Sequence, residues 1–193
     1  MTKRRKFIVF ASGSGTTLQA IIDAIRDDTL EAQINLVVSD HQDAYALERA
    51  KKAGIETYVI KAKKTNEIDE ELSKVLDGYD VDLIVLAGYL RMIGQKLLER
   101  YTIINTHPSL LPKFGGKGMH GMNVHNAVVE AGEKESGVTV HFVNAEYDKG
   151  DIIWQTKVPV YPEDTAEDVS TRVQAAEKPQ LISVLRDFTK GKI

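Results

Sequence analysis

Short apolar runs alternate with helical patterns along the first hundred residues. The runs KFIVFAS (6–12), INLVVSD (34–40), ETYVIK (56–61) and DLIVLAG (82–88) predict strands. Between them, the segments 18–27, 45–54 and 66–76 carry apolar residues at helical spacing, and the second should end at Gly54. Strands that are apolar on both faces and separated by helices predict a Rossmann-like, doubly wound α/β fold with a mostly parallel sheet.

The pattern changes after about residue 100. A fifth strand is expected to end at Ile103–Ile104, and residues 108–121 form a loop with two prolines and four glycines before a helix at 124–131. GVTVHFVN (137–144) and IIWQTKVPV (152–160) follow without a helix between them, which predicts an antiparallel hairpin in the C-terminal half. A last helix opens at 164–177 with a capping box formed by Thr165 and Asp168, and Pro179 should break or restart it.

Composition limits the classes of protein to consider. Of the 193 residues, 42% are hydrophobic and 27% are charged, which is typical of a globule with a sizeable core. The net charge of −3 gives no global attraction to nucleic acid or to an acidic membrane. The absence of cysteine excludes disulfides and thiolate metal sites and fits a cytoplasmic protein. We expect one domain, 1–193, without a signal peptide or a membrane span.

A glycine-rich turn joins the first strand to the first helix. In SGSGTTLQA, Gly13 and Gly15 allow close approach of a ligand to the backbone, and Thr16 and Thr17 add hydroxyl donors. Leu18 stands where a dinucleotide-binding fingerprint has its third glycine, so a phosphate monoester fits better than a pyrophosphate. A plain strand–helix turn is the alternative.

The stretch INTHPSLLP places an amide and an imidazole two residues apart. In an extended segment, Asn105 and His107 point to the same side, and we expect them in a crevice at the carboxyl ends of the strands. Together they can stabilise an oxyanion and supply a proton. From the residues alone, a structural histidine explains His107 as well.

Two more titratable groups can join this pair. Asp148, or alternatively Asp151, lies in the hairpin sequence YDKGD and can return to the crevice to pair with a histidine, although D-x-G is also ordinary turn chemistry. His141 alternates with Val140 and Phe142 in a predicted strand, and packing at the edge of the core explains it at least as well as a role in the site. The five histidines lack the spacing of a metal site.

These motifs carry a resemblance to a known family. SGSGTTLQAIIDA, DLIVLAGYLRMI, INTHPSLLPKF, SGVTVHFV and YDKGDII are similar to segments of the phosphoribosylglycinamide formyltransferases, folate-dependent transferases of purine biosynthesis. The N-x-H-P-S-L-L-P stretch is typical of folate formyl transfer enzymes as a group. The phosphate loop and the chain length favour this member over methionyl-tRNA formyltransferase and formyltetrahydrofolate hydrolase.

The resemblance implies a reaction and a role for each motif. A formyl group passes from the cosubstrate 10-formyltetrahydrofolate to the amine of glycinamide ribonucleotide. Residues 1–100 would be the phosphate-binding half and 101–193 the catalytic and folate half of a monomer or homodimer. The implied phosphate site is Gly13, Gly15, Thr16 and Thr17; the folate site is Leu90, Arg91, Met92, Ile93 and Asn105; the catalytic residues are Asn105, His107 and Asp148. Asp148 is expected to raise the pKa of His107.

The chain departs from the family pattern in two places. It reads Glu177-Lys178-Pro179 where the family has E-H-x-x-Y-P, so a contact of Glu177 with the substrate is one reading among others. The family often has an arginine for the folate glutamate tail where this chain offers Lys63 and Lys64. A hydrolase acting on the same folate and a nucleotide-binding module without catalysis are the competing functions.

Overall fold

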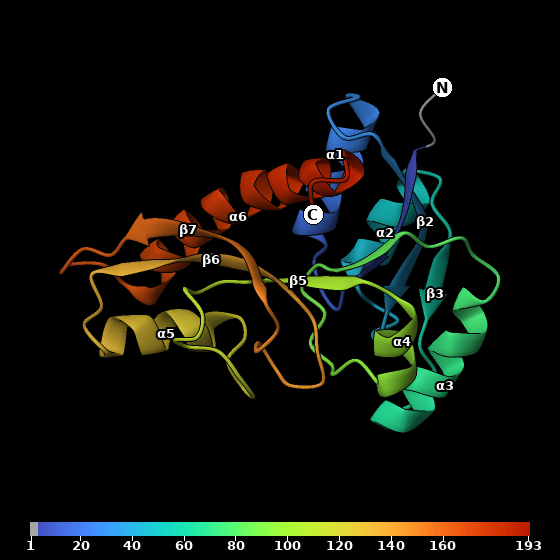
Figure 1. Ribbon diagram of the computed structural model, residues 1–193. Helices are drawn as coiled ribbons and strands as arrows, with labels where there is room; N and C mark the ends of the chain where they lie inside the picture. The colour runs from blue at the N-terminus through green and yellow to red at the C-terminus, as the bar shows by residue number, and fades with distance from the viewer. Residues whose placement is uncertain (1–3) are drawn as a thin grey trace. The chain divides into compact units, whose positions relative to one another are not determined.

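The computed structural model describes residues 4–193 (Figure 1). Its helices and strands follow in the order β1 (Arg5–Phe10), α1 (Thr16–Arg26), β2 (Ala32–Ser39), α2 (Tyr45–Lys52), β3 (Thr57–Val59), α3 (Thr65–Leu76), β4 (Leu83–Leu86), α4 (Gln95–Arg100), β5 (Ile103–His107), α5 (Met122–Glu130), β6 (Glu135–Phe142), β7 (Ile152–Pro159) and α6 (Ala166–Thr189).

The strands form one sheet in the order β3-β2-β1-β4-β5-β6-β7. The chain divides into two compact units, residues 1–104 with 185–193 and residues 105–184. Strand β5 begins in the first unit and ends in the second. The predicted α/β fold with a mostly parallel sheet is confirmed, whereas the single domain stays a prediction.

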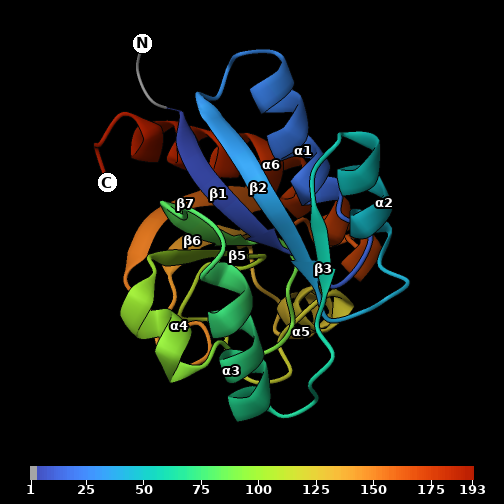
Figure 2. The same ribbon diagram turned by 90° about the vertical axis from the view of Figure 1, so that its right-hand side faces the viewer.

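In the first unit, β1 pairs in parallel with both β2 and β4, and β2 with β3. The side chains of β1 from Phe7 to Phe10 and all of those of β4 are buried, as expected for strands covered on both faces. Helix α1 contacts α2, and α3 contacts α4. Figure 2 shows these two pairs on opposite sides of the strands, because right-handed crossovers reach the other face when the strand order reverses after β3.

In the second unit, β6 and β7 form the predicted antiparallel hairpin, from the Glu135–Pro159 pair to the His141–Ile152 pair. Valines from α5, β6, β7 and α6 pack into the core of this unit: Val128, Val138, Val158, Val169 and Val173. The hairpin thereby presents the loop 143–151 at the end of β6.

The predicted helix caps are confirmed. At the start of α6, the Thr165 N–H donates to Asp168 Oδ2 at 2.9 Å, and the Asp168 N–H donates to Thr165 Oγ1 at 3.2 Å. Gly54, at φ +71°, follows the last turn of α2.

The prediction that Pro179 breaks the last helix is wrong. Helix α6 runs through Pro179 without interruption. Val173 before it and Leu181 after it are both buried, and burying such side chains stabilises the helix by about 1.5–3 kcal/mol each, which offsets the local cost of the proline.

Helix α4 was not predicted because its cap lies elsewhere in the chain. The buried carboxylate of Asp69 in α3 accepts the backbone N–H groups of Lys96 (2.9 Å) and Leu97 (3.1 Å). No residue next to α4 gives this signal.

Candidate active site

The glycine-rich turn is built around Gly15. This residue caps α1 in the left-handed conformation at φ +71°, and a Cβ there would lie 2.6 Å from the Cα of Ala46. No other residue type fits without moving α2. Gly13 has no such constraint, because a Cβ built on it meets no atom within 4 Å. The open space over Gly13 is what close approach of a ligand to the backbone requires.

Helix α2 fixes the carbonyls of the same turn. The Ala46 N–H donates to the Gly13 carbonyl (3.1 Å), and Arg49 Nε donates to the Ser14 carbonyl (2.8 Å). Because these acceptors bond to α2, the turn offers a ligand its donors rather than its carbonyl oxygens. The first turn of α1 contains no acidic residue, so the positive end of the helix dipole favours an anion here.

The segment Leu90–Ile93 follows β4 and is anchored to this turn. Ser12 N–H donates to the Gly88 carbonyl (3.1 Å), and Leu90 N–H donates to Ser12 Oγ (3.2 Å). Ile93 is buried, while Leu90 is 49% exposed. Arg91 directs its Nε to the carboxylate of Asp40 at 2.8 Å. The segment therefore presents an apolar side chain on a fixed backbone, and the guanidinium of Arg91 is bonded to Asp40 and to the Lys63 carbonyl.

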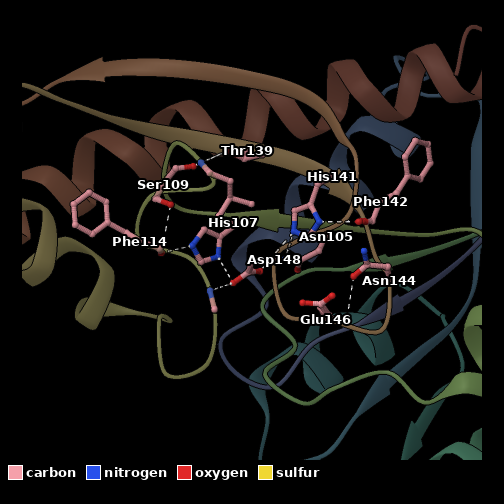
Figure 3. Close-up of polar contacts among 12 residues, drawn as sticks. Asn105, His107, Ser109, Phe114, Thr139, His141, Phe142, Asn144, Glu146 and Asp148 are labelled. Atoms are coloured by element: carbon pink, nitrogen blue, oxygen red, sulfur yellow. Dashed lines mark hydrogen bonds and ion pairs between the residues drawn. The ribbon is translucent and has the colours of Figure 1, made fainter.

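The second unit gathers four polar side chains, which we call the polar cluster: Asn105, His107, His141 and Asp148 (Figure 3). His107 is buried at the end of β5. Its Nε2 donates to the Phe114 carbonyl at 2.8 Å, and its Nδ1 lies 3.5 Å from Asp148 Oδ2. Both ring nitrogens thus face acceptors, an arrangement that the protonated imidazolium satisfies fully.

Burial opposes that protonated form. Desolvation lowers the pKa of His107, and the charge of Asp148 and the Phe114 carbonyl offset this effect only in part. Asp148 raises the pKa of His107 as predicted, but the prediction left out the burial of the ring, which outweighs Asp148 and lowers the pKa overall. Asp148 remains ionised: burial raises its pKa, but the bond to His141, the charge of His107 and the Gly116 N–H together hold it below its usual value.

His141 belongs to the cluster. The ring is buried on β6, Nδ1 donates to the Phe142 carbonyl (2.8 Å), and Nε2 lies 3.1 Å from the Asn105 amide nitrogen and 3.6 Å from Asp148 Oδ1. Asp148 therefore lies between two imidazoles (Figure 3). The pairing of β6 with β7 shifts by a bulge between Val140 and His141. The alternation of side chains along a regular strand, on which the sequence prediction for His141 relied, does not reveal such a bulge.

Two members of the site hold a backbone conformation that is rare outside glycine. Asp148 has φ +56° and Phe114, whose carbonyl receives His107, has φ +54°. Such residues cost stability and are concentrated at functional sites. The Gly116 N–H donates to Asp148 Oδ2 at 2.9 Å and fixes the carboxylate. Sequence reasoning missed Phe114 and Gly116 because both act through backbone atoms.

The loop after β5 is tied to the hairpin by its own hydrogen bonds. Thr139 Oγ1 donates to the Ser109 carbonyl (2.7 Å) and accepts the Leu111 N–H (3.1 Å). Ser109 Oγ in turn donates to the Lys113 carbonyl at 2.7 Å. These bonds place the Phe114 carbonyl against His107.

A cavity of about 340 Å³ opens beside Asp148. Its lining is mostly apolar or backbone, and Tyr147 and Ile152 expose part of their side chains there. A ligand in this cavity would meet apolar side chains, the ring of Tyr147 and the charged residues Asp148 and Lys149. The lining includes Leu111, Pro112, Gly115, Gly116, Tyr147 and Ile152.

The family resemblance also implied Lys64 and Glu177. Lys64 occupies the N-cap position of α3 without a capping bond from its side chain to any described residue. Its Nζ lies 3.7 Å from Glu67 Oε1, and 77% of its side chain is exposed. Glu177 lies in α6. Within residues 4–193, no group of acidic or histidine side chains is arranged to hold a metal ion, and no helix is long and apolar enough to cross a membrane.

Comparison with known proteins gives one consistent family. The family model described as "Formyl transferase" matches residues 5–185. The phosphoribosylglycinamide formyltransferase of Haemophilus influenzae is 42% identical over 98% of this chain and 89% of its own length. The phosphoribosylglycinamide formyltransferase of Escherichia coli is 38% identical over 96% of this chain and 88% of its own length. The crystal structure of glycinamide ribonucleotide transformylase 1 from Symbiobacterium toebii matches with a TM-score of 0.89 and 39% identity, over 97% of this chain and 88% of that one.

Proposed function

The chain belongs to the formyl transferase family, and from this premise we propose that it transfers the formyl group of 10-formyltetrahydrofolate to the amine of glycinamide ribonucleotide. The observation that carries the proposal is the polar cluster, in which the ionised carboxylate of Asp148 faces a buried imidazole at 3.5 Å. A protein that merely binds a nucleotide gains nothing from burying a carboxylate beside an imidazole at such a cost.

The reaction needs charge stabilisation and one proton transfer. The substrate amine attacks the formyl carbon, a new C–N bond forms, and the carbonyl oxygen becomes an oxyanion. The Asn105 amide and the protonated ring of His107 stabilise this oxyanion. The bond from the formyl carbon to the folate N10 then breaks, and the proton lost by the amine reaches N10 through Asp148 and water.

Asp148 has a second task in this scheme. Burial favours the neutral imidazole and the charge of Asp148 offsets this only in part, so the carboxylate and the developing oxyanion together would stabilise the proton on His107. Figure 3 shows the carboxylate within reach of both histidine rings. The cation then forms where the reaction develops negative charge, which is where it accelerates the chemical step.

The other half of the substrate chemistry is assigned to the first unit. The turn with Gly13, Gly15, Thr16 and Thr17 would bind the ribose phosphate, supported by the helix dipole and the open space over Gly13. The four residues Leu90, Arg91, Met92 and Ile93 would bind the pterin, mainly through their backbone atoms and through the exposed side chain of Leu90. Lys64 remains a candidate for binding the glutamate tail of the folate, and Glu177 remains a candidate for a contact with the ribonucleotide.

The protein is proposed to act in the cytoplasm, because the sequence contains no cysteine and suits a reducing compartment. It is proposed to be a monomer or a homodimer. The single domain of 1–193, with halves 1–100 and 101–193, is proposed as the working unit.

One assay separates the candidate functions. The protein is mixed with glycinamide ribonucleotide and 10-formyltetrahydrofolate, and the folate absorbance is followed. Loss of the formyl group that requires the ribonucleotide amine supports the transferase. The control is the ribonucleotide with its amine acetylated. Formate release without the ribonucleotide would indicate a hydrolase, and no change in absorbance would contradict the proposed enzyme.

A further inference from the structure

Asp40 is a buried carboxylate that the reaction described above does not use. It follows directly after β2, and its side chain is 4% exposed. Arg91 Nε donates to its Oδ2 at 2.8 Å, the nearby Ser12 side chain helps to lower the pKa of the carboxyl group, and Oδ1 is buried without a hydrogen-bond partner among the described residues. A carboxylate this deep needs partners, because an uncompensated buried charge costs several kcal/mol.

Ser12 and Arg91 lead directly to the segment after β4. Ser12 Oγ accepts the Leu90 N–H at 3.2 Å. Arg91 is the next residue, and its Nη1 donates to the Lys63 carbonyl at 3.1 Å. Asp40 is therefore hydrogen-bonded to Arg91 and lies near Ser12, whose hydroxyl holds the Leu90 backbone, and all of these residues lie in the first unit.

The charges around Asp40 are those of an ionised acceptor. Burial raises its pKa, but the Ser12 side chain, the bond from Arg91 and the charge of His41 outweigh burial and hold the pKa below the usual value. His41 Nε2 lies 3.7 Å away, on the exposed side. Hydrogen bonds to an ionised group are about twice as strong as neutral ones, so this acceptor holds its donors firmly.

We propose that Asp40 is a positioning residue for the formyl folate: through Ser12 and Arg91 it fixes the backbone of Leu90–Ile93 in the conformation that binds the pterin. The inference rests on the proposed function. It predicts a larger effect on the folate than on the ribonucleotide, because Asp40 bonds directly to Arg91, whereas Gly13 and Ser14 of the phosphate turn are also held by Ala46 and Arg49.

The kinetic test uses Asp40→Asn, which keeps the size and removes the charge. We expect the KM for 10-formyltetrahydrofolate to rise about tenfold, with kcat and the KM for the ribonucleotide within about threefold of wild type. Arg91→Met should give a similar change, and the double variant should be no worse than the stronger single one, because both remove the same bond. A rise in both KM values together, or a loss of kcat alone, would overturn the proposal.

The matched control is Asp164→Asn. Asp164 also forms a largely buried pair with an arginine, Arg172, at 2.7 and 3.1 Å, but in the second unit, where it joins α6 to the segment before it and, within the described part of the chain, bonds to no member of the polar cluster. Its replacement should leave both KM values within about twofold. If it raises the folate KM as much as Asp40→Asn does, the effect is general destabilisation and the proposal fails.

A measurement without turnover keeps this inference separate from the proposed function. Hydrogen exchange of the Leu90 amide in the ligand-free protein should be about tenfold or more faster in Asp40→Asn and in Ser12→Ala than in wild type. Unchanged exchange in Asp40→Asn would show that Asp40 does not hold the segment. If wild type lacks transferase activity but Leu90 responds, the assignment of the reaction fails and the positioning network stands.

Discussion

At the scale of single residues, Asp148 combines an uncommon backbone with a shared carboxylate. Its φ of +56° lies in the left-handed region, which asparagine and aspartate tolerate better than other side chains. Its carboxylate lies within 3.6 Å of ring nitrogens of both His107 and His141. Asparagine is therefore the substitution that removes the charge and keeps the backbone.

Asp148→Asn should bind both substrates about as well as wild type and lose turnover by ~10²–10⁴. The pKa of His107, already lowered by burial, should fall further because its charged form loses a partner. Titration of the His107 ring by NMR in both proteins measures the shift. Full activity with an unchanged titration would show that Asp148 is an ordinary turn residue.

Gly13 allows a test of the phosphate site without strain. A Cβ at this position meets no atom within 4 Å, so Gly13→Ala should fold with a free energy of unfolding within about 0.5 kcal/mol of wild type. The methyl group would occupy the space over the backbone, and we expect ribonucleotide binding to weaken about tenfold, or about 1.4 kcal/mol, by calorimetry.

Gly78→Ala is the control for Gly13→Ala, because its Cβ would make an ordinary contact of 3.6 Å with the Val75 carbonyl oxygen. Equal ribonucleotide binding by the two variants would argue against a phosphate site over Gly13.

At the scale of elements, the sequence predicted what local chemistry determines. The strands, the helix that follows the glycine-rich turn, and the capping box at Thr165 were all readable from neighbouring residues. Helix α4 was not, because its cap comes from Asp69 in another helix. The continuity of α6 through Pro179 was not readable either, because burial on both sides of the proline decides it.

The proline in α6 should limit the stability of the protein. Pro179→Ala restores a backbone donor inside a helix and removes the clash of the ring with the preceding turn. The gain is partly offset by the larger freedom of the unfolded chain. We expect the free energy of unfolding to rise by about 1–2 kcal/mol in urea denaturation.

Pro162→Ala serves as the comparison for Pro179→Ala, since Pro162 is exposed and precedes α6. Its free energy of unfolding should stay unchanged or fall slightly. If Pro179→Ala is less stable than wild type, the packing of the proline ring stabilises the protein by more than the proline costs the helix.

At the scale of the whole molecule, the candidate site could be predicted as a set of residue types but not as an electrostatic environment. Asn105 and His107 were named from their motif, Asp148 was chosen over Asp151 only through the family resemblance, and the structure brings His107 and Asp148 together. The lowered pKa of His107 depends on burial, which is a property of the folded chain and is not encoded in any short motif. The same holds for the Phe114 carbonyl.

Buried histidines should make stability depend on pH. Burial lowers the pKa of both His107 and His125 from the ordinary 6.5, and the charge of His107 adds to the effect on His125. The unfolded chain therefore binds more protons as the pH falls below 6.5 towards the lowered values. Stability is complete above that window and is lost within it, by up to about 1.4 kcal/mol per pH unit for each group.

Urea denaturation at about pH 7.5 and about pH 5.5 measures this slope. His125→Gln should flatten it, while His120→Gln should not, because His120 is exposed. A slope that is the same in all three proteins would contradict the assignment of His125 to the acid sensitivity.

The position of Trp154 has a spectroscopic consequence. It is the one tryptophan of the sequence, and it is 60% exposed on β7, the last strand of the sheet. Its indole is already largely hydrated in the folded protein, so its emission should change little on unfolding. Denaturation is therefore better followed by circular dichroism. Tryptophan fluorescence is instead suited to detecting a second molecule that covers the edge of the sheet, which would shift the emission to shorter wavelength.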